Sequence, residues 1–285
     1  MLTKEQKQHF RRDGVIVVPD AIGPELLGEL RRDFDGWVAA SRAETGPYGR
    51  TIDGRPRFDV EPGHTSDAPG LRRVASPTEI SDAHARAAFD SPVADMAADL
   101  IGPNVRFHHA KVNSKLPHTR TTVKWHQDFP FDPHSNDDLL TALMFVTDLT
   151  DQNGPLRVVP GSHLGPLHSL WQGGVFTGAV ADNVAAEFEA AAISCTGPAG
   201  AVCLMHSRLA HASSVNRSDA ARTLLIAAYA AADAVPLSPV AVPSAHAGRI
   251  VRGDEPGVIR STAFAVETPE IPKSASFFDQ QAENT

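Results

Sequence analysis

The spacing of apolar residues predicts helices in the first third of the chain. A helix over about residues 3–12 is followed by a short apolar strand at 15–18. Pro24 opens a second helix, whose apolar face contains Leu26, Leu27, Leu30 and Phe34. A third helical pattern covers residues 82–101. Helices therefore dominate the predicted structure before residue 102.

Residues 44–80 show neither a helical nor a strand period and are rich in Gly, Pro, Asp and Arg. A loop of this length inside a compact domain is usually functional or mobile. We therefore predict a flap over the functional site. Arg72 and Arg73, within this stretch, are expected on a solvated face, with contact to an acidic substrate as the alternative.

From Val105 onward the pattern changes to short strands separated by Gly, Pro, Asn and Asp clusters. The predicted strands are 105–112, 121–128, 140–149, 156–159, 192–195, 201–206 and 222–231. Composition alone would make 222–231 helical, because it is rich in alanine, but its apolar run also fits a buried strand.

Helices followed by many strands indicate a mainly β protein, a sandwich or barrel with flanking helices. We expect a single domain over residues 1–285. It would have a helical part at about 1–102, a β core at about 103–235 and a C-terminal extension at about 236–285.

Composition narrows the range of partners. The 285 residues carry a net charge of -8 without any Lys/Arg block, so nucleic acid and anionic membranes are not expected partners. No stretch approaches the ~20 apolar residues of a membrane helix. The charged N-terminus has no secretory pattern. Cys195 and Cys203, the only cysteines, are expected as buried free thiols, and the cytoplasm is the expected location.

The segment Trp125-His126-Gln127-Asp128 contains the most specific chemistry. Residues two apart on a strand project to the same face, so His126 and Asp128 can reach one point. An imidazole and a carboxylate so placed are two of the three ligands of the 2-His-1-carboxylate set that holds non-haem Fe(II). A third ligand should lie far along the chain.

Two histidines are candidates for that third ligand. His211 precedes Arg222 at the same spacing at which His206 precedes Arg217. Arg217 lies in a polar turn, whereas Arg222 begins an apolar strand, where a buried guanidinium needs an anion. This difference favours His211 as the ligand.

Iron held by three ligands on one face keeps its other positions open. A bidentate 2-oxo acid can occupy two of them and leave one for O₂. Its far carboxylate would then need a partner, and a planar guanidinium pairs with both oxygens. Arg222 is our candidate, assisted by the hydroxyl group of Ser213.

Several ordered motifs extend over roughly residues 5–235. They are the run WHQDFPF, the segment 136–140, Asn153-Gly154-Pro155-Leu156, the segment 159–163 and His211-x-Ser-x-x-Asn-x-Ser-x-x-x-Arg222. Together they resemble the phytanoyl-CoA dioxygenase (PhyH) family. The resemblance implies a double-stranded β-helix (jelly-roll, cupin-like) core and an oxygenase that uses Fe(II), 2-oxoglutarate and O₂.

The resemblance also implies site residues. His126, Asp128 and His211 would bind iron, and Arg222 and Ser213 the C5 carboxylate of 2-oxoglutarate. The segment 107–113 is similar to a strand of ectoine hydroxylases. That similarity implies that Asn113 contacts the other end of the cosubstrate and that Lys111 lies close to substrate.

The expected reaction is hydroxylation of a small molecule. Related halogenases have Ala or Gly in place of Asp128, so its carboxylate favours hydroxylation, while desaturation, epoxidation or cyclisation would use the same ligands. A non-catalytic metal or metabolite sensor and a zinc hydrolase are the alternatives from other classes. No further catalytic residue is expected beyond the metal ligands.

The substrate itself is not specified by the sequence. Phe129 and Phe131 could form an apolar wall, and the segment departs from ectoine hydroxylases there. A small polar or carboxylated metabolite is favoured over an acyl-CoA, because no basic cluster suits the CoA phosphates. His108 and His109 are adjacent, so only one should face the cavity, and neither is expected to be a ligand. Monomer and homodimer are both compatible with the sequence.

Overall fold

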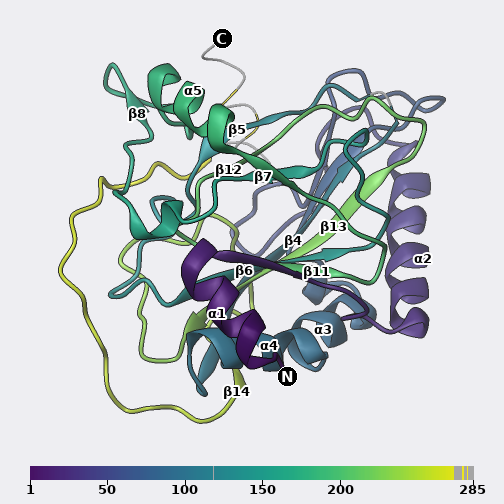
Figure 1. Ribbon diagram of the computed structural model, residues 1–285. Helices are drawn as coiled ribbons and strands as arrows, with labels where there is room; N and C mark the ends of the chain where they lie inside the picture. The colour runs from purple at the N-terminus through teal and green to yellow at the C-terminus, as the bar shows by residue number, and fades with distance from the viewer. Residues whose placement is uncertain (118, 273–277, 279–280, 282–285) are drawn as a thin grey trace.

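The computed structural model describes residues 1–117, 119–272, 278 and 281. Two antiparallel sheets face each other across the middle of the molecule, as Figure 1 shows. Within the described residues the larger sheet has eight strands, in the order β1-β11-β6-β13-β4-β3-β2, with β14 also pairing with β4. Its strands are β1 (Val15–Val18), β2 (Phe58–Val60), β3 (Leu71–Ala75), β4 (Val105–Lys115), β6 (Leu139–Phe145), β11 (Val202–His206), β13 (Arg222–Ala231) and β14 (Ile250–Arg252).

The smaller sheet has the order β10-β7-β12-β5. Its strands are β5 (Val123–His126), β7 (Leu156–Val158), β10 (Ile193–Cys195) and β12 (His211–Ser213). A separate hairpin consists of β8 (Trp171–Gln172) and β9 (Val175–Phe176). The chain passes repeatedly between the two main sheets, which confirms the predicted mainly β, double-stranded β-helix core.

The pleat of the larger sheet sorts its side chains between two cores. On β6, Ala142 and Met144 face a core shared with the helices, whereas Leu143 and Phe145 face the smaller sheet. There they pack with residues such as Val158 of β7. One face of this sheet therefore supports the helices, and the other encloses the space between the sheets.

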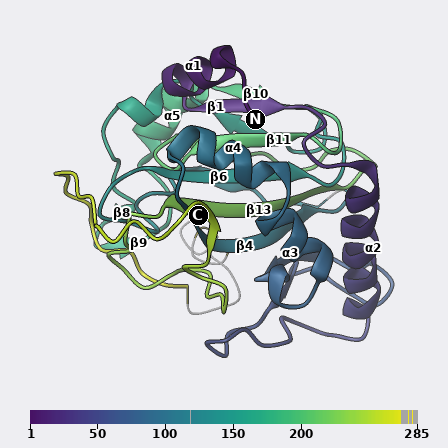
Figure 2. The same ribbon diagram turned by 90° about the horizontal axis from the view of Figure 1, so that it is seen from below.

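Helices cover the outer face of the larger sheet, as Figure 2 shows from below. α4 (Pro92–Ile101) lies across the central strands, with α3 (Asp82–Phe89) beside it and α2 (Pro24–Ser41) along one edge. The remaining helices are α1 (Lys4–Asp13) and α5 (Asp182–Ala191), with short 3-10 turns η1 (Pro77–Glu79) and η2 (Ser162–Leu164). No helix in the described ranges is long and apolar enough to cross a bilayer.

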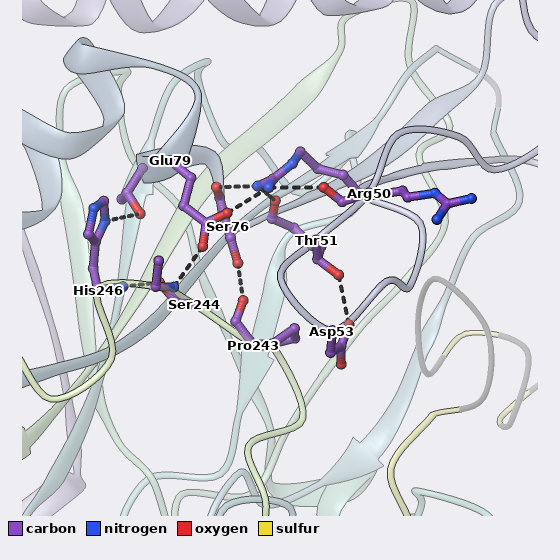
Figure 3. A network of polar contacts seen from close by, with 12 residues as sticks. Arg50, Thr51, Asp53, Ser76, Glu79, Pro243, Ser244 and His246 are labelled. Atoms are coloured by element: carbon purple, nitrogen blue, oxygen red, sulfur yellow. Dashed lines mark hydrogen bonds and ion pairs between the residues drawn. The ribbon is translucent and has the colours of Figure 1, made fainter.

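The segment 44–80 is not the flap that its composition suggested. It contains β2 and β3, and β3 pairs with β4, so it completes one edge of the larger sheet. Arg57 is buried and donates hydrogen bonds to the backbone oxygens of Ala75 and Ser76 at 3.0 and 2.8 Å. Figure 3 shows how Ser76 and Glu79 extend this network to the segment 243–246. The segment is therefore anchored on both sides.

Other differences from the predicted elements have local causes. The helical pattern over 82–101 is two helices, because Ser91-Pro92 caps and starts a new one. The part before residue 102 also contributes β1, β2 and β3 to the larger sheet. The strand predicted at 222–231 is correct despite its alanine content, because β13 is buried along its whole length. Cys195 and Cys203 are buried and free, as expected.

Candidate metal centre and adjoining pockets

Three potential metal ligands meet between the two sheets. β5 ends at His126, and Asp128 follows two residues later, while β12 begins at His211. His211 and His126 are directly opposite in the register of the smaller sheet. Each Nε2 atom lies 3.6 Å from Oδ1 of Asp128, and the three ligand atoms lie within 4.8 Å of one another. The structure thus brings together the residues selected from the sequence.

The tautomers of both histidines suit metal binding. Nδ1 of His126 lies 2.8 Å from the carbonyl oxygen of Lys124, and Nδ1 of His211 lies 2.9 Å from that of Leu209. A carbonyl oxygen only accepts, so each Nδ1 carries the proton and each Nε2 presents a lone pair. That is the arrangement of histidines that bind a metal through Nε2.

The carboxylate of Asp128 is held in its charged form. Burial would raise its pKa, but His211 and His126 outweigh that effect and hold the pKa well below the usual value. Burial and the neighbouring His126 lower the pKa of His211 to about 4, so this ring is neutral at pH 7. Two imidazoles and one carboxylate are the donor set that non-haem Fe(II) takes.

Thr141 of β6 supports the site, although no sequence pattern indicated this residue. Its Oγ1 donates a hydrogen bond of 2.8 Å to Oδ2 of Asp128, which leaves Oδ1 facing the imidazoles. Replacing an outer partner of this kind typically costs about 10–100-fold in metal affinity or activity. We expect Thr141→Val to weaken Fe(II) binding by about tenfold or more, measured by anaerobic titration. An unchanged affinity would show that Thr141 does not orient the ligand.

His206, the alternative to His211, lies elsewhere. It ends β11, and its ring packs against Phe10 and His163 at centroid distances of 6.4 and 5.3 Å. Arg217, its partner in the alternative spacing, is an exposed turn residue. The preference for His211 and Arg222 in the sequence analysis agrees with this placement.

Two cavities meet at the triad. Lys111, His126, Asp128 and Thr141 line both of them. Towards one end of β4 and β13 the cavity is also lined by Asn113, Lys115, His211, Ser213 and Arg222. Towards the other end it is lined by Arg73, His108, His109, Phe131 and Asp132. We name these the cosubstrate pocket and the substrate pocket, after the ligands that we propose for them under the proposed function.

The cosubstrate pocket contains two buried basic side chains. Arg222 and Lys115 are opposite each other on β13 and β4. Lys115 donates a hydrogen bond of 2.8 Å to Oγ of Ser213, and Nε of Arg222 donates one of 3.0 Å to the carbonyl oxygen of Gly154. Burial lowers the pKa of Arg222 to about 10, while burial and Arg222 together hold the pKa of Lys115 well below its ordinary value. A bound anion would favour the charged form of both groups.

The backbone conformation at Gly154 explains why the Asn-Gly-Pro motif has glycine at its centre. Its φ is +79°, which favours glycine, and a Cβ there would lie 2.6 Å from the carbonyl oxygen of Ser214. Only glycine lets this turn approach β12 closely enough for its carbonyl group to meet Arg222.

Lys115 was missed by the sequence analysis. It follows Asn113 by two residues, so strand alternation places both on the same face. That periodicity could have identified it. Asn113 itself is in the pocket, and its Oδ1 is buried without a hydrogen bond in the described structure. Buried polar atoms are normally hydrogen-bonded, so we expect a polar ligand or water to contact this amide oxygen.

Of the predicted substrate residues, Lys111 and Phe131 line the substrate pocket but Phe129 does not. The ring of Phe131 meets that of His126 edge to face at a centroid distance of 5.6 Å. Phe129 is fully buried in a separate apolar cluster with Phe264, at a centroid distance of 5.0 Å. The turn after Asp128 directs these two phenylalanines to opposite sides. Phe129 is therefore a core residue.

His108 and His109 both line the substrate pocket, contrary to expectation. The register of β4 with β13 passes from Ala228↔His109 to Tyr229↔Phe107, so His108 is the extra residue of a β-bulge. A bulge interrupts the alternation of side chains and redirects one of them. The rule that adjacent strand residues face opposite sides therefore fails at this point.

The comparisons with known proteins agree with this geometry. The family model described as phytanoyl-CoA dioxygenase (PhyH) matches residues 10–224. A probable alpha-ketoglutarate-dependent hypophosphite dioxygenase of Stutzerimonas stutzeri is 32% identical over 240 residues, which is 82% of this chain and 80% of that protein. An L-proline trans-4-hydroxylase of Streptomyces griseoviridis is 27% identical over 261 residues, covering 84% of this chain and 90% of the relative.

Among solved structures, EctD from S. alaskensis with 2-oxoglutarate and 5-hydroxyectoine superimposes with a TM-score of 0.66. The sequence identity is 25%, and the match covers 81% of this chain and 77% of that one. The same fold therefore accommodates both a cosubstrate and a small organic product in EctD.

Proposed function

Because this chain belongs to the phytanoyl-CoA dioxygenase family, we propose that His126, Asp128 and His211 hold its Fe(II) ion. The protein is a 2-oxoglutarate-dependent non-haem iron dioxygenase that acts on a small molecule. The observation that carries the ligand assignment is that the Nε2 atoms of His126 and His211 each lie 3.6 Å from Oδ1 of Asp128. Bound iron would supply the activation of O₂.

The cosubstrate assignment follows from charge. We propose that Arg222, Ser213 and the newly found Lys115 bind the C5 carboxylate of 2-oxoglutarate, and that Asn113 contacts its other end. Two buried cations and one hydroxyl group converge in this pocket, and a carboxylate would neutralise them. The pocket opens on the proposed iron site, which a chelating 2-oxo acid requires.

The proposed reaction inserts one oxygen atom of O₂ into an unactivated C–H bond of a small metabolite. The second oxygen atom enters succinate as 2-oxoglutarate loses CO₂. Relatives named for hypophosphite and L-proline support a small substrate. We place that substrate in the pocket with Lys111 and Phe131. Desaturation, epoxidation or cyclisation at the same iron site is the alternative outcome.

We also propose that residues 1–285 form one oxygenase domain, because strands from before residue 102 complete the larger sheet. Two buried free cysteines are compatible with work in the cytoplasm. Either a monomer or a homodimer would serve this chemistry.

Anaerobic titration of the Fe(II)-loaded protein with 2-oxoglutarate tests the function. We expect the weak visible charge-transfer band of an Fe(II)–2-oxo acid chelate to develop in the wild type. His206→Ala should retain the band, because His206 lies outside the site. His211→Ala should lose it together with the metal. Metal binding without the band in the wild type would instead favour a sensor or a hydrolase.

A further inference from the structure

The substrate pocket contains more basic than acidic groups once the metal centre is set aside. Four charged side chains line it: Arg73, Lys111, Asp128 and Asp132. The charge of Asp128 belongs to the proposed iron site. Two cations and one carboxylate then remain around the space where a substrate would lie. Among the described lining residues outside the proposed iron site, basic side chains therefore outnumber carboxylates.

The two cations reach the pocket from neighbouring strands. In the register of β3 with β4, Arg73 is opposite Asn113 and Ala75 is opposite Lys111. Strand alternation places Arg73, Lys111 and His109 on the inner face of the sheet. Arg73 is only 4% exposed, so it is not the solvated residue that its segment suggested. Its charge therefore acts inside the pocket, where screening by water is weak.

Two buried histidines add hydrogen-bonding atoms to the same pocket. Nε2 of His108 and Nδ1 of His109 make no hydrogen bond within the described residues. Asp132 is the nearby acidic group. Its Oδ1 atom lies 3.4 Å from Nε2 of His108, and its Oδ2 atom lies 4.0 Å from Nδ1 of His109. His108 and His109 are 7% and 5% exposed. Buried polar atoms of this kind are normally satisfied by a ligand or by water.

We propose that this pocket binds a small molecule through an anionic oxygen group, a carboxylate or a phosphorus oxyanion, between Arg73, Lys111 and the histidine pair. The proposal rests on the proposed function, because it names the substrate class of that same iron site. The anionic group would hold the substrate against Arg73, Lys111 and the histidine pair, and its oxidisable bond would then point towards the metal.

The test uses the Fe(II)-loaded protein with 2-oxoglutarate under anaerobic conditions. The probes are acetate, hypophosphite and L-proline, with acetamide as the uncharged analogue of acetate. Binding is followed by perturbation of the charge-transfer band and by calorimetry. We expect at least one anionic probe to bind far more tightly than acetamide. Hypophosphite alone would identify a phosphorus oxyanion, whereas acetate or L-proline would identify a carboxylate.

Two substitutions that change the charge of the pocket in opposite directions make the test specific. Lys111→Met should weaken binding of the anion by about ten- to a hundredfold, as expected for loss of a charged hydrogen bond. Asp132→Asn should leave that binding unchanged or strengthen it several-fold, because it removes a like charge. Lys4→Met, an equal charge change at an exposed helix position, should have no effect.

Either of two results would overturn the proposal. One is a band that forms with 2-oxoglutarate but responds to none of the three probes that carry an anionic oxygen group, which leaves the proposed function intact. The other is weaker binding in Asp132→Asn with no change in Lys111→Met, which would assign the pocket to a cation. A band that never forms contradicts the proposed function itself, and this inference with it.

Discussion

Asp128→Ala is expected to abolish metal-dependent turnover while the protein still folds. The substitution removes the carboxylate from the proposed ligand set and leaves its two imidazoles. Loss of an outer-shell partner alone costs about 10–100-fold in metal affinity, so loss of this ligand should cost more than about a hundredfold. Anaerobic Fe(II) binding and 2-oxoglutarate decarboxylation measure the effect. Normal turnover in this variant would contradict the ligand assignment.

Asp137→Ala is the matched control for that variant. Asp137 also carries a paired carboxylate, 2.7 Å from Nη1 of Arg208, but lies outside the triad. We expect it to retain Fe(II) binding and turnover. Both variants should unfold cooperatively on heating, since neither removes apolar core packing. A loss of metal in both would indicate a general structural effect in place of ligand loss.

The proposed metal ligands could be selected from the sequence because their relation is local in part. His126 and Asp128 were expected on one strand, where residues two apart share a face. In the structure β5 ends at His126, and Asp128, in the bend that follows, still lies beside both imidazoles. Only the partner His211 required a choice, and the expected burial of Arg222 favoured the histidine that the structure places beside His126 and Asp128. The β core was predictable for the same reason, because the apolar runs and turn residues are themselves local.

Arg73 and His108 could not be placed at the cavity in the same way. Arg73 reaches the pocket only because β3 pairs with β4, a contact between distant segments that no period indicates. His108 faces the cavity through a bulge, which one strand alone does not indicate. Phe129 and Phe131 have the same chemistry, and only the turn after Asp128 separates their environments. Register and turn geometry, more than residue type, decided each case.

Arg222→Met should weaken the binding of 2-oxoglutarate without lowering the thermal stability of the metal-free protein. Truncating one partner of a buried charge pair costs about 2–5 kcal/mol, so we expect 2-oxoglutarate to bind about 30-fold more weakly or worse. The metal-free variant should melt at the same temperature as the wild type or higher. The reason is that methionine fills similar volume without a buried charge beside Lys115. Thermal unfolding with and without Fe(II) and 2-oxoglutarate measures both effects.

Arg217→Met is the control, because Arg217 is exposed and belongs to the alternative spacing with His206. It should keep the stabilisation that a bound cosubstrate confers on the folded state. In Arg222→Met that stabilisation should disappear at the same ligand concentration. If Arg222→Met instead loses stability without ligand and still binds 2-oxoglutarate, then Arg222 is a structural residue. Lys115 and Ser213 would in that case hold the C5 carboxylate without it.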